Sequence, residues 1–431
     1  MKTIENVSKK VTLSSPVQMM DSLAKKTLLD RLRLLSCGHL IVEDGEDVYA
    51  FGQSINESHL VARIRIHEQA AYTQILFGGA IGSGEAYMAG AWSSPELVNV
   101  IRVFVLNKAQ LSNMDSGWSW LNKSLSSAAG FFRLNTKLGS KKNIAAHYDL
   151  SNAFFSLFLD ESMMYSSAIF PSEDVSLSQA SLIKLERVCQ RLKLKESDHL
   201  LEIGTGWGGM AIYAAKHYGC KVTTTTISQR QFDMAVARVK AARLEGKVTV
   251  LLRDYRDLNG EYDKLVSIEM VEAVGHQFYS DFFARCSRLL KSNGLMLMQA
   301  ITTQDQRYER EKNKIDFIRK YIFPGGCLPS NQVVLKHIAQ DTDMHLVGLD
   351  DITLDYALTL NAWKKRFFEK VDEVKDMGFD DVFIRMWDFY LCYCEGGFKE
   401  RVINTSQFLF AKPMCRELPD VTESQPKGWV L

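Results

Sequence analysis

The chain has 431 residues, of which 46% are hydrophobic and 24% charged, as expected for a folded protein with more than one domain. Its 52 Lys and Arg residues balance 51 Asp and Glu residues, so the formal net charge of +1 produces no overall field that would attract nucleic acid. A nucleic-acid partner is therefore disfavoured, and any anionic ligand must meet a local basic patch.

The first part of the chain, residues 1–120, is predicted to form a small α+β domain. Leucines separated by Lys and Arg over residues 23–35 predict an amphipathic helix that lies on this domain or, alternatively, faces a membrane. Alternation of apolar and polar side chains over 60–66 predicts a strand, and the glycine-rich run 78–84 predicts a break between elements. Residues 95–106 are predicted to be helical.

A second domain is predicted over residues 143–415, after a linker at 121–142 and before a flexible tail at 416–431. Its strands and helices are expected to alternate, with strands at 200–203, 221–227, 248–252, 264–270 and 295–301 and helices at 177–194, 209–218, 230–244 and 279–290. Such alternation predicts an α/β fold with a parallel sheet, whose ligands bind beyond the C-terminal ends of the strands. A charged helix is expected at 304–321, followed by aromatic-rich helices and a late strand at 405–410.

The most distinctive stretch is Leu-Leu-Glu-Ile-Gly-Thr-Gly-Trp-Gly-Gly at 200–209, which is an apolar strand, a glycine turn and a helix start. Glycines admit positive φ and let a ligand approach the backbone, and the first turn of a helix offers unpaired N–H groups. The spacing does not match the dinucleotide pattern G-x-G-x-x-G, and no G-K-[ST] follows. With Glu202 before Gly204, the stretch resembles the first motif of S-adenosylmethionine-dependent methyltransferases; an ordinary α/β crossover turn is the alternative.

Several further blocks occur in a fixed order along the chain. They are His147-Tyr148-Asp149-Leu150-x-Asn152, Met164-Tyr165-Ser166, Thr226-Ile227-Ser228-x-x-Gln231, Asp254-Tyr255-Arg256-Asp257-Leu258, Glu272-x-Val274-Gly275, the run 320–330 and Asp355-Tyr356. Together with the glycine turn, they resemble the cyclopropane-fatty-acyl-phospholipid synthase family, which is related to the mycolic acid cyclopropane synthases. The resemblance extends over about residues 60–412 and includes a Gly-Glu-x-Tyr-Met-x-Gly-x-Trp block at 84–92 that is similar to the N-terminal domain of the phospholipid-acting branch.

The resemblance implies a Rossmann-like class I methyltransferase sheet and an S-adenosylmethionine-dependent C-methyltransferase. The implied reaction transfers a methyl(ene) group to the cis double bond of an unsaturated acyl chain of a phospholipid and forms a cyclopropane fatty acid. The same methylation ending in a methyl- or methylene-branched fatty acid is the alternative. Two further alternatives are a small-molecule methyltransferase and a non-catalytic lipid-binding module.

Matching positions also imply a binding site for S-adenosylmethionine. The residues concerned are Tyr165, Ser166, Glu202, Gly204, Gly206, Thr226, Gln231, Asp254 and Tyr255. For the polar members of this set, and for Ser228 beside them, capping of helix and loop ends is the alternative role, because Thr, Ser and Asp are favoured N-caps.

An isolated alkene is a poor nucleophile, so catalysis must come from alignment, a dry site, aromatic faces that stabilise a cation, and a base. In the family the base is thought to be a bicarbonate ion; here Glu272, Tyr356 and Ile301 match the positions that hold it. Ser167 stands where Cys is usual, Gln299 where His is usual, and Ala273 follows Glu272 where His is usual. Glu269 adds a carboxylate where a small residue is usual. Ser and Gln can donate hydrogen bonds to an anion, but these departures leave bicarbonate binding and the product open.

Eight cysteines without paired metal-ligand spacing predict scattered thiols of a reducing compartment and no metal site. The first ten residues are polar, and no apolar stretch is long enough to span a bilayer. We therefore expect a cytoplasmic protein that contacts the inner face of the membrane peripherally, through the basic segments 307–320 and 364–368. Solvated helix faces are the alternative for both segments. A homodimer formed through the N-terminal domain is a further expectation from the family.

Overall fold

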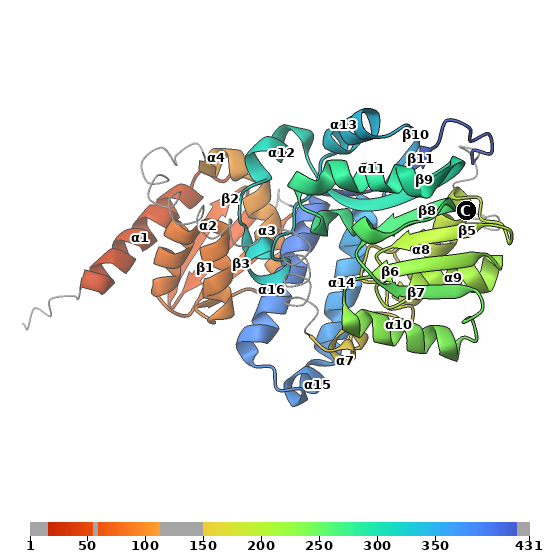
Figure 1. Cartoon of the computed structure of the whole chain (residues 1–431). Coiled ribbons are helices and arrows are strands. Elements are labelled where there is room, and N and C mark those ends of the chain that lie inside the picture. The colour runs from red at the N-terminus through yellow and green to blue at the C-terminus, as the bar shows by residue number, and fades with distance from the viewer. Residues whose placement is uncertain (1–15, 55–58, 113–149, 420–431) are drawn as a thin grey trace, which may run out of the picture. The chain divides into compact units, whose positions relative to one another are not determined.

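The computed structural model describes residues 16–54, 59–112 and 150–419 (Figure 1). Two compact units divide the chain, Met1–Asp115 and Ser116–Leu431. The predicted linker at 121–142, the block His147-Tyr148-Asp149 and most of the predicted tail lie outside the described residues. No helix among the described residues is long and apolar enough to cross a membrane.

The first unit combines a four-stranded sheet, in the order β2-β1-β3-β4, with helices. Its elements are α1 (Pro16–Leu32), β1 (His39–Asp44), β2 (Asp47–Gly52), β3 (Val61–Ile66), α2 (Ala70–Met88), β4 (Trp92–Ser93), α3 (Leu97–Leu106) and α4 (Lys108–Ser112). Strand β3 alternates buried and more exposed side chains, as its sequence predicts, because successive side chains of a strand point to opposite faces.

The expected break at 78–84 is confirmed at one residue, because the helical run α2 is interrupted inside this range. Only Gly79 departs from helical geometry, with φ +54° and ψ −137°, and there the helix kinks. Gly82 allows close approach across the kink, since a Cβ on it would lie 2.2 Å from the carbonyl oxygen of Gln74. The glycines therefore allow both the interruption at Gly79 and the close packing of the two helical parts of α2.

The second unit has a seven-stranded sheet in the order β10-β11-β9-β8-β5-β6-β7 (Figure 1). Its strands are β5 (His199–Ile203), β6 (Lys221–Thr226), β7 (Val248–Leu252), β8 (Tyr262–Ile268), β9 (Leu290–Thr303), β10 (His345–Asp351) and β11 (Ile403–Ala411). The five strands β5–β9 are parallel to one another, whereas β11 is antiparallel to both β9 and β10. The α/β class is confirmed, and the sheet is mixed rather than wholly parallel.

Helices of the second unit connect and cover these strands. They are α7 (Asn152–Ser156), α8 (Leu177–Arg191), α9 (Gly209–Tyr218), α10 (Gln229–Ala241), α11 (Tyr279–Leu289), α12 (Asp305–Glu311), α13 (Asn331–Asp341), α14 (Thr353–Glu369), α15 (Val371–Asp376) and α16 (Asp381–Lys399), with 3₁₀ turns η2 (Tyr255–Asp257), η3 (Val271–Ala273) and η4 (His276–Phe278) and the π-turn η5 (Ile318–Ile322).

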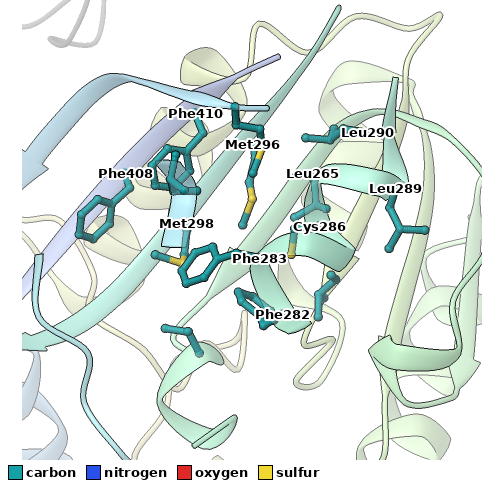
Figure 2. Packing of buried hydrophobic residues seen from close by; sticks show 14 of the residues in the cluster. Leu265, Phe282, Phe283, Cys286, Leu289, Leu290, Met296, Met298, Phe408 and Phe410 are labelled. Carbon is teal, nitrogen blue, oxygen red and sulfur yellow. The ribbon is translucent and has the colours of Figure 1, made fainter. Parts of the chain in front are cut away.

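Both faces of the large sheet are buried. On one face, side chains of β8, β9 and β11 pack against Phe282 and Phe283 of α11, as Figure 2 shows. On the other face, alternate residues of the same strands pack against α8, α9 and α10. Burial on both faces explains why the central strands are nearly continuous apolar runs. It also leaves the ends of the strands as the places where polar chemistry can be built.

The predicted continuous helix at 304–321 is wrong. Helix α12 ends at Glu311, and a separate π-turn, η5, begins at Ile318. The guanidinium of Arg319 donates hydrogen bonds to the carbonyl oxygens of Glu311, Lys312 and Lys314, at 3.2, 2.9 and 2.8 Å. The side chain of Arg319 thus satisfies carbonyl groups that a continuous helix would have paired internally.

Candidate active site

The glycine turn after β5 is shaped for close approach of a ligand. Gly204 and Gly206 have φ of +103° and +51°, which side chains rarely allow. A Cβ on Gly206 would meet no atom within 4 Å, whereas one on Gly209 would lie 2.4 Å from the carbonyl oxygen of Ser162. The space above Gly206 is therefore open, while the start of α9 is closely packed.

Glu202 lies beneath this turn and is buried. Its carboxylate accepts a 2.6 Å hydrogen bond from the hydroxyl of Thr224, which is in turn 2.7 Å from the hydroxyl of Thr205. Burial raises the pKa of Glu202 to about 8, although the Thr224 hydrogen bond and the charge of Lys184 oppose the rise. The carboxyl group therefore ties strand β5 to strand β6 below the open space.

At the end of β6, Thr226 and Gln231 are brought together as expected. The Thr226 hydroxyl donates to the side-chain oxygen of Gln231 at 2.8 Å and accepts from the backbone N–H of Ser228 at 3.1 Å. The hydroxyl of Ser228 accepts from the backbone N–H of Gln231, so Ser228 is the N-cap of α10. The capping alternative is confirmed for Ser228.

At the end of β7, the carboxylate of Asp254 is engaged by Arg256. The side-chain nitrogens of Arg256 donate to both of its oxygens, at 2.8 and 2.6 Å, and the guanidinium lies 5.6 Å from the centre of the Tyr255 ring. Asp254 also accepts a hydrogen bond from the backbone N–H of Arg256 and begins the turn η2. These contacts fix the positions of Asp254 and Tyr255 at the end of β7.

The segment before α8 is fastened to the glycine turn. The indole N–H of Trp207 donates to the side-chain oxygen of Asn152 at 2.8 Å. Arg238 on α10 donates to the carbonyl oxygens of Trp207 and Ser162, at 2.8 and 3.1 Å. These bonds hold the residues around Tyr165 beside the turn, although they are far from it in the sequence.

Tyr165 stands in a cluster of aromatic rings. Its hydroxyl lies 2.9 Å from that of Tyr390, and its ring centre is 5.1 Å from Trp363 and 5.2 Å from Phe155. Tyr356 of α14 stacks on Phe398 of α16, and their ring centres are 4.4 Å apart. Aromatic faces of this kind pack as a core and also stabilise a nearby cation without reacting with it.

Glu269 occupies the centre of the polar part of the site. Its Oε1 accepts hydrogen bonds from the backbone N–H of Ser167 at 2.9 Å and from the side chain of Gln299 at 2.8 Å. Its Oε2 accepts a 2.8 Å hydrogen bond from the hydroxyl of Tyr356. Burial raises the pKa of Glu269, and these three donors oppose the rise because they stabilise the charged form.

The backbone of Glu269 is strained. Its φ is +49°, an uncommon value for a residue other than glycine that costs about 1–3 kcal/mol. The backbone N–H of Glu269 donates to the carbonyl oxygen of Gln299 at 2.7 Å, so β9 supports the unusual conformation. Strain of this kind persists where the surrounding structure fixes it, and it gathers at functional sites.

Glu272 lies three residues after Glu269, in the turn η3, and its carboxyl group has fewer hydrogen-bond partners than that of Glu269. Its Oε1 accepts from the backbone N–H of Ile301, while its Oε2 is buried without a hydrogen-bond partner in the described part of the chain. Burial, helped by the charge of Glu269, raises the pKa of Glu272 to about 8. Glu272 therefore favours its protonated form at neutral pH, and Oε2 is the oxygen that a ligand could contact.

The structure thus joins Glu272, Ile301, Tyr356, Gln299 and Ser167 around one additional carboxylate, that of Glu269. Ser167 takes part through its backbone, because its hydroxyl donates to the carbonyl oxygen of Ala168 at 2.9 Å. Gln299 thus donates from its side chain to a carboxylate of the site, whereas Ser167 donates from its backbone.

Two residues of the site were not anticipated from the sequence. Lys184 is buried on α8 and donates to the hydroxyl of Ser166 at 2.9 Å. Gln407 on β11 donates to the side-chain oxygen of Gln299 at 2.9 Å. A lysine at a core position of a predicted amphipathic helix was the available signal for Lys184, while nothing in the sequence pairs Gln407 with Gln299.

A glycine turn with open space above it, a buried acid below it and polar residues at the next two strand ends define a class I methyltransferase. These residues fit S-adenosylmethionine, since the open space at Gly206 lies where a cofactor approaches the backbone in such sheets.

Comparison with known proteins identifies the family. Residues 136–408 match the family described as mycolic acid cyclopropane synthetase, and the chain belongs to this family of S-adenosylmethionine-dependent methyltransferases. The chain is 38% identical, over 77% of its length and 78% of the relative's, to the tuberculostearic acid methyltransferase UfaA1 of Mycobacterium tuberculosis. It is 36% identical, over 84% of its length and 90% of the relative's, to the cyclopropane-fatty-acyl-phospholipid synthase of Escherichia coli.

A solved structure agrees with these sequence matches. The mycolic acid cyclopropane synthase CmaA1, in complex with SAH and CTAB, superposes with a TM-score of 0.59 at 30% identity, over 63% of this chain and 98% of CmaA1. The predicted fold, family and cofactor are therefore confirmed.

Proposed function

We propose that this methyltransferase alkylates the cis double bond of an unsaturated acyl chain carried by a phospholipid. The observation that carries the proposal is the placement of Glu269, a carboxylate held by three donors, at the same strand ends as the glycine turn. The E. coli relative, whose name states a phospholipid substrate, matches across most of both chains and supports the carrier.

Bound S-adenosylmethionine would supply an electrophilic methyl group. The glycines, Glu202 and the Thr226–Gln231 pair would hold the cofactor, Tyr165 and Ser166 would flank its methionine end, and Asp254 and Tyr255 would flank its adenine. The rings around Tyr165 would exclude water and stabilise the carbocation that the alkene becomes on accepting the methyl group.

Glu269 would then take a proton from this cation. Its negative charge is directed by Ser167, Gln299 and Tyr356, and a base of this kind contributes about 10²- to 10⁴-fold to rate. Glu269 would then return the proton to water by exchange with the protonated Glu272, which releases its own proton as it accepts the new one and whose Oε2 has no other partner in the described part of the chain. In this scheme Glu269 occupies the place that bicarbonate has in the family, so no bicarbonate is required.

Removal of a proton from the added methyl group closes a ring and gives a cyclopropane fatty acid, which is the product we propose first. A specific observation favours the second product, a methyl- or methylene-branched chain. Glu269 is fixed at the end of β8, so it abstracts whichever proton its position reaches, and loss of a proton from a neighbouring carbon leaves an unsaturated branched chain. A saturated methyl branch forms only if a separate hydride donor, such as a reduced nicotinamide, then reduces it. A relative at 38% identity is named a tuberculostearic acid methyltransferase.

Mass spectrometry of lipids tests the activity and separates most of these products. Vesicles of unsaturated phospholipid are incubated with the protein and a methyl donor labelled in its methyl group. Labelled acyl chains are expected, and their absence would overturn the proposal. A saturated methyl branch adds two hydrogens relative to a ring and differs in mass, whereas a methylene branch has the mass of the ring and is distinguished by fragmentation.

We also propose transient contact with the membrane surface, which a phospholipid substrate requires. The basic segments supply fewer free charges than their sequences suggest. Arg307 pairs with Glu311, Lys364 lies 3.1 Å from Asp388, and Arg366 donates to the carbonyl oxygen of Leu159. In segment 364–368 this leaves Lys365 and Phe368 exposed. Co-sedimentation with anionic vesicles at low salt is the test, and failure to sediment would remove the proposal.

Localisation at the inner face of the membrane and a homodimer remain parts of this proposal. So does the division into an N-terminal domain at 1–120 and a catalytic domain at 143–415. Light scattering of the full chain measures the oligomeric state directly.

A further inference from the structure

Lys184 is an unusual residue in this site because its side chain is completely buried. Lysine is almost never fully buried unless it is paired. The ammonium donates a 2.9 Å hydrogen bond to the hydroxyl of Ser166, and no ion pair joins it to a carboxylate in the described ranges. A buried cation held by one neutral hydroxyl is costly, so a role for it must be sought in its surroundings.

Ser166 is the middle of a three-residue segment that is held from three sides. The hydroxyl of Tyr165 meets Tyr390 of α16 at 2.9 Å. The backbone N–H of Ser167 donates to Glu269 at 2.9 Å. Lys184 of α8 supplies the third attachment, between the other two. The segment thus connects the aromatic cluster to the carboxylate that we propose as the base, and Lys184 fixes its centre.

The charged groups around Lys184 come from separate elements. Burial lowers the pKa of Lys184 to about 8, and the negative charges of Glu269 and Asp160 oppose this fall; Glu202, whose own pKa is about 8, opposes it only when ionised. Lys184 therefore remains largely protonated at neutral pH. Its positive charge in turn favours the ionised form of Glu269, which also faces Tyr356 of α14, Gln299 of β9 and the neighbouring Glu272.

We infer that Lys184 is a positioning residue for the methyl transfer. Its ammonium holds Ser166, and with it the segment 165–167, in the geometry that binds the cofactor, and its buried charge, one residue from the Ser167 N–H that binds Glu269, favours the ionised form of Glu269. The second part of this inference rests on the proposed role of Glu269 as the base. The first part depends only on cofactor binding.

The test compares three variants of the full chain. Lys184→Met removes the charge at nearly constant volume. Lys264→Met is the matched control, because Lys264 is another largely buried lysine and lies at the opposite end of β8 from Glu269. Ser166→Ala removes the hydrogen-bond acceptor and keeps the ammonium. S-adenosylhomocysteine affinity is measured by titration calorimetry, and kcat with unsaturated phospholipid vesicles is measured across pH.

Lys184→Met is expected to weaken S-adenosylhomocysteine binding about tenfold, because a charged hydrogen bond that orders the segment is lost. It is also expected to move the acid limb of kcat to higher pH by about one unit, because Glu269 then binds its proton more tightly. Ser166→Ala should weaken binding and leave the acid limb in place. Lys264→Met should change neither.

Wild-type affinity and an unmoved acid limb in folded Lys184→Met would overturn the inference. Folding is checked by thermal unfolding; if Lys184→Met does not fold, wild-type affinity in Ser166→Ala overturns the holding role by itself. Absence of lipid turnover by the wild-type protein would count against the proposed function, while the affinity measurements would still report on Lys184.

Discussion

The hydroxyl of Tyr356 donates a 2.8 Å hydrogen bond to Oε2 of Glu269 and so joins helix α14 to the loop after β8. Burial and the nearby carboxylate raise the pKa of Tyr356 well above its usual range, so the phenol keeps its proton and remains a donor. Ser167 and Gln299 donate to Oε1, so hydrogen bonds orient both oxygens of Glu269. These hydrogen bonds fix the orientation of the Glu269 carboxylate, as its proposed role as a base requires.

Glu269→Gln tests this assignment most directly. The amide keeps the shape of the side chain but cannot accept the proton, so turnover of labelled lipid should fall by at least about 100-fold. S-adenosylhomocysteine affinity should stay at the wild-type value. Glu309→Gln, an exposed glutamate of α12, is the control and should be fully active. Normal turnover by Glu269→Gln would refute the role of Glu269 as base.

Glu269→Ala should convert the protein to dependence on an added anion. The substitution leaves room among the donors of Ser167, Gln299 and Tyr356, which would then accept bicarbonate or formate. Wild-type turnover should be unaffected by removal of bicarbonate, whereas the variant should be inactive without it and partly restored by millimolar additions. Loss of wild-type activity in bicarbonate-free buffer would show instead that Glu269 does not replace the ion.

Glu272→Gln should reduce the yield of modified lipid by about tenfold. The amide oxygen can still accept from the backbone N–H of Ile301, so the loss should be smaller than for Glu269→Gln. What is lost is the exchange of a proton through Oε2. The measurement is the initial rate at pH 7 with labelled methyl donor, and an unchanged rate would exclude Glu272 from the proton transfer.

Glu202→Gln should change how stability depends on pH. The native pKa of Glu202, about 8, lies above that of an exposed glutamate, so the native state binds more protons between pH 5 and 8. The free energy of unfolding should therefore fall as pH rises through this range, by about 3 kcal/mol between pH 5.5 and 8 for this group. Urea unfolding at pH 5.5 and 8 measures it, and the variant should show a smaller fall. An equal fall in both proteins would contradict the raised pKa.

Gln407→Leu should impair turnover without touching cofactor binding. The Gln407 amide donates to the oxygen of Gln299 and thereby keeps the nitrogen of Gln299 directed at Glu269. Without it the Gln299 amide can turn over, and kcat should fall about tenfold while S-adenosylhomocysteine affinity stays constant. Wild-type kcat in a folded variant would show that Gln299 keeps its orientation unaided.

Much of the second unit could be predicted because its signals are local. The helix Gly209–Tyr218 and the strand Val248–Leu252 have the expected bounds, since an apolar run, a turn and a helical period each occupy a short window. The extent of α2 across its glycines and the early end of the helix predicted at 304–321 were not predictable in this way. A glycine inside α2 and the carbonyl contacts of Arg319 depend on packing partners that a local pattern does not contain.

The site divides in the same way. Residues in recognisable blocks, such as Glu272 and Tyr356, can be placed in the site from their sequence positions. The added carboxylate of Glu269 stands out in the sequence because the family usually has a small residue there. Its three hydrogen-bond donors were not foreseeable together. They come from three separate stretches of the chain, and the contact between Gln407 and Gln299 requires the register of two antiparallel strands.

The bonds from Arg238 and Trp207 have a consequence for how ligands come and go. They clamp the carbonyls at 162 and 207 and the side chain of Asn152, so one wall of the glycine turn is locked to the segment before α8. Opening that wall would break several hydrogen bonds at once. We therefore expect this corner to keep its structure while spent cofactor is exchanged for fresh.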